Sequence, residues 1–416
     1  MTIETFEIPS FHPSQLDDLH RRLENVIYPH ELVLKDNPWA YGTPRQALEP
    51  LVQKWRYSYD WETARTEMNQ WHHYKLTGEN GLKLHFIHEP SKDPKAIPIV
   101  LVHGWPSSFY EFHKVINPLR DGKDGSQAYH VVVPSLPGYG FSEPSTTPGF
   151  GIPQMGDAIH HLMLSLGYTK YACHGTDWGM MIVRYLAATH DKHCLAMHST
   201  MFMALPPLPT ITNLWKRPIN VFKFLAGATI LGFDQVYGPG KFKSAGNNFA
   251  DVINNKDAGY RAIQGTRPYS LSYGLTDSPV GLLGWVLEKY HNWTYHSNNK
   301  DASVLPDTIS PDELLTQVSL YWLTNTISSS MRLYYEFFQQ TDEMLKVFER
   351  RISIPFGVSN FESDITRSPR EWVEACGNLQ FYSEHSVGGH FSSLEVPDLI
   401  VDDLRSFGKK VAKSFE

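Results

Sequence analysis

The pentapeptide GTDWG, residues 175–179, places a carboxylate where a buried strand is expected to turn into a helix. The strand pattern KYACH precedes it and the helical pattern WGMMIVRYLAA follows it. A tight turn of this kind leaves no room for side chains at its two ends, which Gly175 and Gly179 occupy. Because the serine version of the motif, GxSxG, is absent, the turn predicts Asp177 as a carboxylate nucleophile. The alternative is an aspartate that only caps the helix, and the pentapeptide by itself favours neither interpretation.

The segment HGWP, residues 103–106, ends the apolar run AIPIVLV and predicts an oxyanion hole. Hydrolases with a nucleophile at such a turn take one backbone N–H from this loop and another from the residue after the nucleophile. Those donors would be the backbone N–H groups of Trp105 and Trp178. We expect His103 to position the loop rather than to transfer a proton. His103, Gly104 and Pro106 would border the bound substrate.

A third motif, GGHF at residues 388–391, supplies a candidate base. It lies after the last predicted strand and before the terminal helix, so the order nucleophile, acid, base is satisfied by His390. An acid should follow the strand RISIPFGVSN and orient the imidazole; Asp364 is preferred, and Glu362 also qualifies. Of the 20 histidines, four others are interpreted as structural: His160, His161, His193 and His198.

The elements that must position these residues alternate between strand and helix. Strands are predicted in AIPIVLV, AYHVVVPSLPG, KYACH and LAMHSTM, with helices in MGDAIHHLMLSLGY and WGMMIVRYLAATH between them. Alternation at this spacing indicates a parallel sheet covered by helices on both faces. After a long helical stretch, the strands RISIPFGVSN and NLQFYSEH and the helix VPDLIVDDLRSFGKKVAKSF complete the pattern.

This organisation predicts an α/β fold with a mostly parallel central sheet. Residues 1–95 are expected to form an ordered N-terminal extension, whose packing on core and lid is implied by a family resemblance described below. Helices are expected around SQLDDLHRRLENV, RQALEPLVQKWRY and DWETARTEMNQWHHY and a strand in LKLHFIHEP. The core occupies residues 96–205 and 346–416. Between them, residues 206–345 form an inserted helical lid.

Composition excludes several classes of protein. The 416 residues are 41% hydrophobic and 19% charged with a net charge of -7, which describes a globular protein without a basic face for nucleic acid. The 3 cysteines lack the spacing of a disulfide framework or a zinc site. No secretory signal or membrane anchor is apparent at the N-terminus, so we expect a cytoplasmic protein without stable membrane insertion.

Taken in order, these motifs resemble those of epoxide hydrolases of the microsomal type, in the branch of soluble fungal members. The resemblance covers the whole chain and rests on HGWP, GYGFSEP at 138–144, the DWG turn and GGHF. It also rests on TRPYSLSYGLTDSPVGLLGWVLEKY and SLYWLTNTISSSMRLYYE in the lid. Thr176 stands where relatives often have glycine, and Asp364 is similar to the fungal acid, whereas the membrane-anchored relatives commonly have glutamate. The resemblance implies an α/β-hydrolase fold.

The resemblance also implies two lid tyrosines that donate protons to the epoxide oxygen. They correspond to Tyr260 and Tyr334, and Tyr335 is the nearest rival of Tyr334. The expected reaction converts a lipophilic epoxide and water to a vicinal diol through an ester on Asp177, without a metal or other cofactor. A homodimer is expected from the resemblance alone. A dehalogenase with the same aspartate and a non-catalytic, ligand-binding member of the fold are the competing interpretations.

Overall fold

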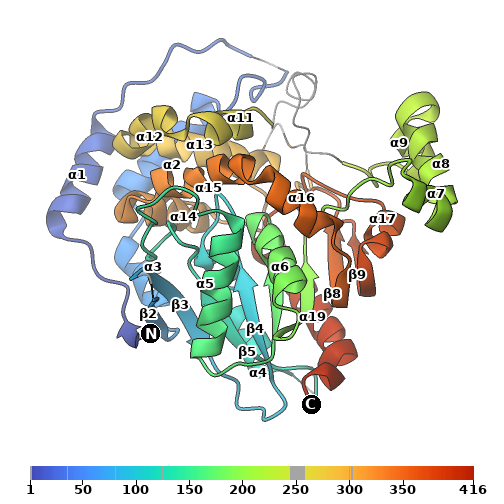
Figure 1. The fold of residues 1–416 in the computed structure, drawn as a ribbon. Helices are drawn as coiled ribbons and strands as arrows, with labels where there is room; N and C mark the ends of the chain where they lie inside the picture. Colours follow the sequence, from blue (N-terminus) through green and yellow to red (C-terminus); the bar gives the residue numbers. More distant parts are fainter. Residues whose placement is uncertain are drawn as a thin grey trace.

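The computed structural model describes residues 2–34, 36–79, 81–123, 125–243, 258–298, 300 and 303–416. Within these residues, 9 strands form one sheet in the order β1-β2-β3-β5-β4-β6-β7-β8-β9 (Figure 1). The strands are β1 (Thr2–Phe6), β2 (His73–Thr77), β3 (Lys83–Glu89), β4 (Ile97–Val102), β5 (Tyr129–Pro134), β6 (Tyr171–Gly175), β7 (Cys194–Ser199), β8 (Ile352–Phe361) and β9 (Gly377–His385).

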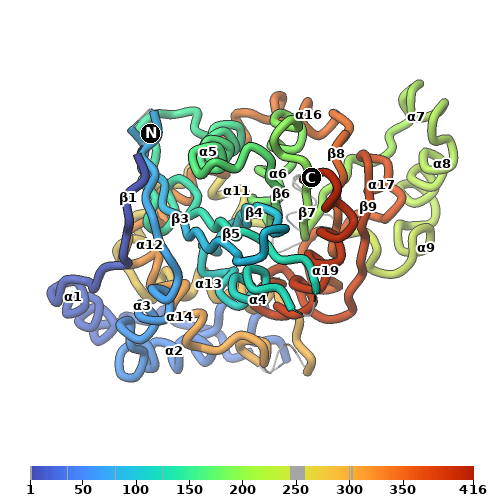
Figure 2. Tube along the Cα trace, turned by 90° about the horizontal axis from the view of Figure 1, so that it is seen from below, coloured from blue at the N-terminus to red at the C-terminus, as the bar shows by residue number. Residues whose placement is uncertain are grey.

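The part of the sheet from β5 to β9 is parallel throughout. Its central strands are almost entirely buried, as expected for strands covered on both faces. Helices α5 (Ile152–Ser165) and α6 (Trp178–Thr189) cover one face, and α4 (Ile116–Asp121) and α19 (Pro397–Val411) cover the other (Figure 2). The predicted α/β fold with a mostly parallel sheet is confirmed. Shorter helical segments are η1 (Phe109–Phe112), α17 (Arg370–Ala375), α18 (Ser392–Glu395) and η5 (Ala412–Ser414).

Strands β1 and β2, at the N-terminal edge of the sheet, were not anticipated from the sequence pattern. The helix expected through Tyr74 ends as α3 at Met68, and the following residues form β2. Tyr74 pairs with Thr5 on one side and Phe86 on the other, so pairing with strands distant in sequence overrides the local helical pattern. The helices of this region are α1 (Pro13–Glu24), α2 (Arg45–Tyr57) and α3 (Trp61–Met68).

A group of helices lies between β7 and β8. Figure 1 shows α11 to α15 lying above the sheet, whereas α7 to α9 project from the body beside α17. The N-terminal helices α1 and α2 pack against α13. The domain boundaries remain predictions. The helices are α7 (Ile211–Lys216), α8 (Pro218–Ala226), the π-helical turn η2 (Gly227–Leu231), α9 (Phe233–Tyr237), α11 (Gly259–Thr266), α12 (Pro268–Asp277), α13 (Pro279–Asn292), α14 (Pro311–Thr324), α15 (Ile327–Gln339) and α16 (Thr341–Glu349).

The turn from β6 into α6 is packed so tightly that its end positions require glycine. A Cβ atom on Gly175 would lie 2.3 Å from the carbonyl oxygen of Gly179. A Cβ atom on Gly179 would lie 1.9 Å from the carbonyl oxygen of Val102, in the neighbouring strand β4. Both contacts are far shorter than van der Waals distance and involve backbone atoms, which cannot rotate away. The two glycines thus set the distance between α6 and the sheet.

Replacing Gly179 with alanine should strongly destabilise the protein. The added methyl group meets the backbone of a central strand, so we expect the free energy of unfolding to fall by about 3 kcal/mol or more. The matched control is Gly274→Ala in α12, where no atom lies within 4 Å of the new Cβ. That control should be neutral or stabilising by roughly 0.5–1 kcal/mol, since alanine favours helix. Thermal unfolding of both variants measures the difference, and similar midpoints would contradict the packing argument.

Candidate active site

Asp177 lies at the start of α6 with φ 46° and ψ -122°, a backbone conformation that non-glycine residues rarely adopt. Its side chain makes no capping hydrogen bond to α6 within the described residues, so helix capping does not explain this aspartate. Instead, Oδ1 accepts a 2.8 Å hydrogen bond from the backbone N–H of Trp105. Oδ2 faces His390, so the two carboxylate oxygens have different surroundings.

The loop that carries HGWP approaches Asp177 at a position where only glycine fits. A Cβ atom on Gly104 would lie 2.2 Å from Oδ1 of Asp177. His103 is fully buried: its Nδ1 donates to the carbonyl of Gly104 at 3.0 Å, and its Nε2 accepts from the N–H of Leu136 at 3.1 Å. Burial lowers the pKa of His103 to about 4, so the ring is neutral. With both nitrogens bonded to backbone, His103 holds the loop and offers no ring nitrogen to a substrate.

His390 approaches the nucleophile from the loop between β9 and α18. Its backbone N–H donates to the carbonyl of Trp293 at the end of α13, at 2.8 Å. Nδ1 donates to Oδ1 of Asp364 at 2.8 Å, and Nε2 lies 3.4 Å from Oδ2 of Asp177. Both acids and the imidazole are buried. Glu362, the other acid considered from the sequence, is exposed, so the fold brings Asp364 onto the imidazole.

Two carboxylates share one imidazole in this buried site. Burial by itself lowers the pKa of His390, but Asp364 and Asp177 outweigh it and raise that pKa to about 10. At neutral pH the imidazole is therefore protonated and forms an ion pair with Asp177. A protonated imidazole cannot accept a proton, so His390 becomes a base only after the charge of Asp177 has been removed.

Tyr260 on α11 and Tyr334 on α15 come from the helices above the sheet. Their rings meet edge to face with centroids 5.7 Å apart, and the ring of Tyr334 meets that of Trp178 at 4.7 Å. Burial, followed by Tyr260 and Asp177, raises the pKa of Tyr334 well above its ordinary value, so its phenol stays neutral. Its hydroxyl is buried without a hydrogen-bonding partner among the described residues. Tyr335 is 39% exposed, whereas Tyr334 is only 1% exposed.

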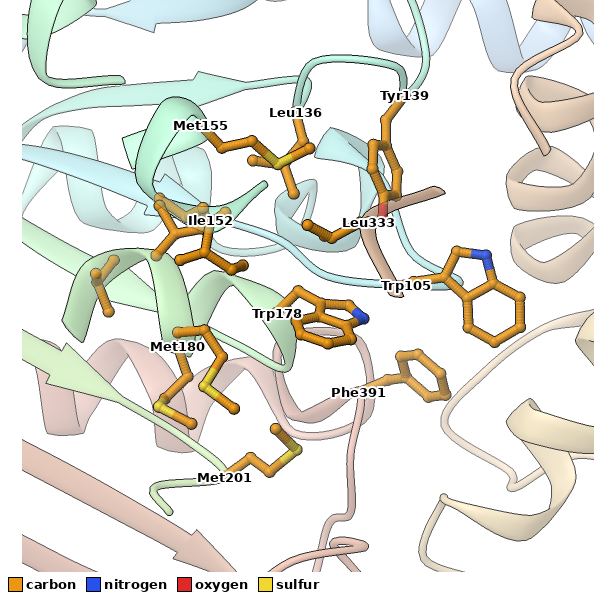
Figure 3. Close-up of a cluster of buried hydrophobic side chains, with 14 of the residues drawn as sticks. Trp105, Leu136, Tyr139, Ile152, Met155, Trp178, Met180, Met201, Leu333 and Phe391 are labelled. Carbon is orange, nitrogen blue, oxygen red and sulfur yellow. The ribbon is translucent and has the colours of Figure 1, made fainter. Parts of the chain in front are cut away.

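Aromatic rings from several distant segments surround the reacting groups. Trp105 stacks on Tyr260 at 5.4 Å, and Trp293 packs against the other edge of this aromatic group, 5.1 Å from Tyr260. Figure 3 shows Trp105, Trp178 and Phe391 gathering from the HGWP loop, α6 and the GGHF loop. Aromatic rings thus cover much of the site, and the apolar surroundings strengthen electrostatic interactions inside it.

A cavity of about 120 Å³ opens beside Asp177, between the core and the helices above it. Thioether and aromatic side chains form most of its wall, which suits a small apolar molecule. Its polar groups include the carboxylate of Asp177 and the phenols of Tyr260 and Tyr334. The apolar lining comprises Met181, Met201, Met203, Phe337, Phe338 and Ile365, together with the ring of Trp178.

Sequence reasoning missed two residues that support this arrangement. Lys289 is 2% exposed, forms an ion pair with Glu288, and holds its ammonium 4.9 Å from the ring centroid of Tyr260. The ammonium therefore makes a cation–π contact with the ring of Tyr260. The sequence feature that could have identified Lys289 is its position inside the otherwise apolar stretch GLLGWVLEKY.

The second is Glu395, whose carboxyl accepts the backbone N–H groups of Phe391 at 3.1 Å and Tyr295 at 2.8 Å. These bonds join the loop of His390 to the residues that follow α13. Burial raises the pKa of Glu395 to about 8. Nothing in the sequence around Glu395 distinguishes it from an ordinary surface glutamate.

Among the described residues, no group of histidine, cysteine and carboxylate side chains converges in a way that could hold a metal ion. In the same part of the chain, no helix is long and apolar enough to cross a membrane.

The fold and the site together define an α/β-hydrolase that presents a carboxylate at the turn where many members of this fold have serine. Residues 3–112 match the family model described as epoxide hydrolase N terminus, and residues 97–236 match that of the alpha/beta hydrolase fold. Epoxide hydrolase 1 of Sus scrofa is 34% identical over 403 residues, which cover 94% of this chain and 86% of that protein.

Two solved structures extend the comparison. The juvenile hormone epoxide hydrolase of the silkworm Bombyx mori superposes with a TM-score of 0.84 at 28% identity, covering 100% of this chain and 96% of that one. The epoxide hydrolase of Aspergillus niger gives a TM-score of 0.79 at 28% identity, covering 99% and 97%. The chain belongs to the epoxide hydrolase family and is an enzyme of that class. The family and fold predicted from the sequence are confirmed.

Replacing Asp364 with asparagine should reduce stability in a pH-dependent way. The pKa of His390 is about 10 in the folded protein, above the ordinary value of about 6.5, so its stabilising charge interactions are complete below pH 6.5 and are lost as pH rises toward 10. The difference in melting temperature between wild type and Asp364→Asn should therefore be largest near pH 6.5 and shrink by pH 10.

Thermal unfolding across that pH range provides the measurement. The matched control is Glu362→Gln, which alters the exposed acid two residues earlier and should leave the melting temperature unchanged. A difference that grows with pH, or an equal loss in the control, would contradict the assignment of the ion pair.

Proposed function

We propose that the protein adds water to a lipophilic epoxide and releases a vicinal diol, by way of an alkyl ester on Asp177. In the first step Oδ2 of Asp177 attacks the less hindered ring carbon, and the bond from that carbon to the ring oxygen breaks. One phenol, of Tyr260 or Tyr334, gives its proton to the departing oxygen while the other donates a hydrogen bond. A phenol suits this role because its unperturbed pKa of ~10 keeps it protonated at neutral pH.

In the second step the ester is hydrolysed. Esterification removes the charge of Asp177 and with it one of the two causes that hold the pKa of His390 high. The imidazolium of His390 first returns a proton to the phenolate left by the first step. The neutral imidazole, oriented by Asp364, then takes a proton from water as the water attacks Cγ of Asp177. Oδ1 becomes an oxyanion held by the backbone N–H groups of Trp105 and Trp178. Breaking of the bond between Cγ and Oδ2 releases the diol, and the alkoxide takes the proton from His390. Transfer of the proton from the new carboxyl of Asp177 to His390 restores the free enzyme.

The observation that supports this mechanism most directly is the unequal placement of the two oxygens of Asp177. Oδ1 already accepts the hydrogen bond that an oxyanion would need, at 2.8 Å from the N–H of Trp105. Oδ2, the candidate attacking atom, lies toward His390. An epoxide has no carbonyl group to attack, but the ester has one, so the same carboxylate serves both steps.

The lining of the cavity favours a lipophilic epoxide, since thioether and aromatic side chains form most of its wall, although Arg261 and Thr366 also line it. Two lid phenols favour protonation of an alkoxide over the release of a halide, which argues against the dehalogenase interpretation. A homodimer and a cytoplasmic location remain predictions.

Oxygen labelling in a single turnover tests the covalent mechanism. With enzyme in excess over styrene oxide in oxygen-18 water, the diol should carry unlabelled oxygen because its new hydroxyl is Oδ2 of Asp177. The peptide that contains Asp177 should gain the label, as measured by mass spectrometry. A diol that carries solvent label in the first turnover would mean that water attacks the epoxide directly.

Removing the hydroxyl of Tyr334 should slow epoxide opening and leave the fold intact. In Tyr334→Phe we expect kcat/KM for styrene oxide to fall by about 100-fold, because a positioned acid typically contributes at least that much. The matched control is Tyr335→Phe, which should retain activity because Tyr335 is 39% exposed and does not line the cavity beside Asp177. Equal activity of the two variants would remove Tyr334 from the mechanism.

A further inference from the structure

A further buried acid, Glu111, lies close to the catalytic groups but takes no part in the mechanism above. It lies on η1, five residues after the HGWP loop, and is 2% exposed. Within the described part of the chain, its Oε1 has no hydrogen-bonding partner. The charged groups that influence it most are His390 and Asp177. An ionisable group so deeply buried requires an explanation.

Three hydroxyl groups surround this carboxyl, and we call them together with Glu111 the Glu111 cluster. The hydroxyls of Ser107 and Thr176 are near enough to lower the pKa of Glu111, and Ser107 also acts on Tyr290. Ser107 follows the HGWP loop, Thr176 immediately precedes the nucleophile, and Tyr290 comes from α13. The cluster therefore joins the loop, the catalytic turn and the lid.

The members of the Glu111 cluster lie close enough to influence one another's pKa, yet the geometry leaves polar atoms of all four residues unsatisfied within the part of the chain that the structure describes. The hydroxyl oxygens of Ser107, Thr176 and Tyr290, like Oε1 of Glu111, are buried without a hydrogen-bonding partner among the described residues. Buried polar groups are nearly always satisfied, and several such groups facing one space form a site for ordered water. Two more buried hydroxyls without described partners, Ser392 and Ser393, lie on α18, which packs against η1.

The charge of Glu111 is linked to the state of the nucleophile. Burial has the largest effect on Glu111 and raises its pKa, and Asp177 acts in the same direction. Ser107, Thr176 and His390 lower that pKa, and the net value is about 7. Esterification of Asp177 removes a negative charge from this neighbourhood. The pKa of Glu111 then falls, and the carboxylate form becomes more populated at the stage when water must be held for deprotonation.

We infer that the Glu111 cluster binds the water that hydrolyses the ester on Asp177, with Glu111 as the residue that positions this water for His390. This inference rests on the proposed covalent mechanism. The water forms a bond to Cγ of Asp177 and its proton goes to His390, as above. Glu111 accepts a hydrogen bond from the water and undergoes no net proton transfer.

Separate measurement of the two half-reactions tests this role. Rapid quenching of a single turnover with styrene oxide, followed by mass analysis of the peptide containing Asp177, gives the rates at which the ester forms and decays. In Glu111→Gln we expect ester formation to stay within about 3-fold of wild type, and ester decay to slow by roughly 10- to 100-fold because misplaced reactants lose that much. The ester should therefore accumulate.

The pH profile separates positioning from a structural role. Ester decay in wild type should show an inflection that Glu111→Gln lacks, because glutamine cannot ionise. Glu111→Asp, which keeps the charge, should recover part of the rate. The groups that also titrate or carry charge around Glu111 are His390, Asp177 and Tyr290, and none of them is altered by these substitutions.

A second variant covers the case in which Glu111→Gln does not fold. Ser107→Ala removes one hydroxyl from the cluster and should slow ester decay but not ester formation. Its matched control is Ser319→Ala, a buried hydroxyl that lies near Tyr59, which should change neither rate. Ester decay at the wild-type rate in Glu111→Gln, or equal slowing of both steps, overturns the inference. Failure of wild type to form any ester would instead overturn the proposed covalent mechanism.

Discussion

The whole site depends on one backbone constraint, the turn that holds Asp177 at φ 46° between β6 and α6. A carboxylate on such a turn projects away from the sheet, toward the loop that follows the neighbouring strand β4. Glycine at position 104 lets that loop come close enough for the N–H of Trp105 to reach Oδ1. The remaining groups can then approach Asp177 only from above the sheet, which is where α11, α13 and α15 lie.

In the proposed mechanism, the charges of the buried groups determine the order of the two steps. Asp177, Asp364 and His390 are all buried, so two negative charges are balanced mainly by one imidazolium. In the proposed mechanism, this balance keeps His390 protonated until Asp177 has reacted with the epoxide. An imidazole with an ordinary pKa would be free to deprotonate water too early. In the proposed mechanism, the raised pKa of His390 keeps the imidazole protonated while Asp177 attacks the epoxide, and Asp364 orients the imidazole while the ester is hydrolysed.

The sequence was most informative where function depends on local geometry. Flanking glycines revealed the turn of Asp177 because tight backbone packing constrains residue type at fixed spacing. The sequence favoured Asp364 but left Glu362 open, since both follow the same strand and only the path of the loop buries one and exposes the other. Tyr334 was chosen over Tyr335 by family resemblance alone, and the helix α15 turns the two rings in different directions.

Other features formed only through packing between distant segments. Strand β2 depends on partners on both sides, so its own residues carried no sufficient signal. Lys289, Glu395 and Glu111 have unusual environments because rings, backbone N–H groups or hydroxyls from other elements surround them. A single sequence without the fold shows them as ordinary charged residues of helices. The exposed or buried state of a charge is thus the part of the site that sequence reasoning could least supply.

The loop that carries His390 is held directly against the end of helix α13. The backbone N–H of His390 is held by the carbonyl of Trp293, and Glu395 ties the same loop to Tyr295, just beyond α13. A Cβ atom on Gly389 would lie 2.4 Å from that carbonyl, so the two segments are in direct backbone contact. Displacing α13 would therefore displace the base. The cavity beside Asp177, in contrast, is lined by residues of α11, α15 and the methionines of the core, and among the described residues its lining includes none from α13.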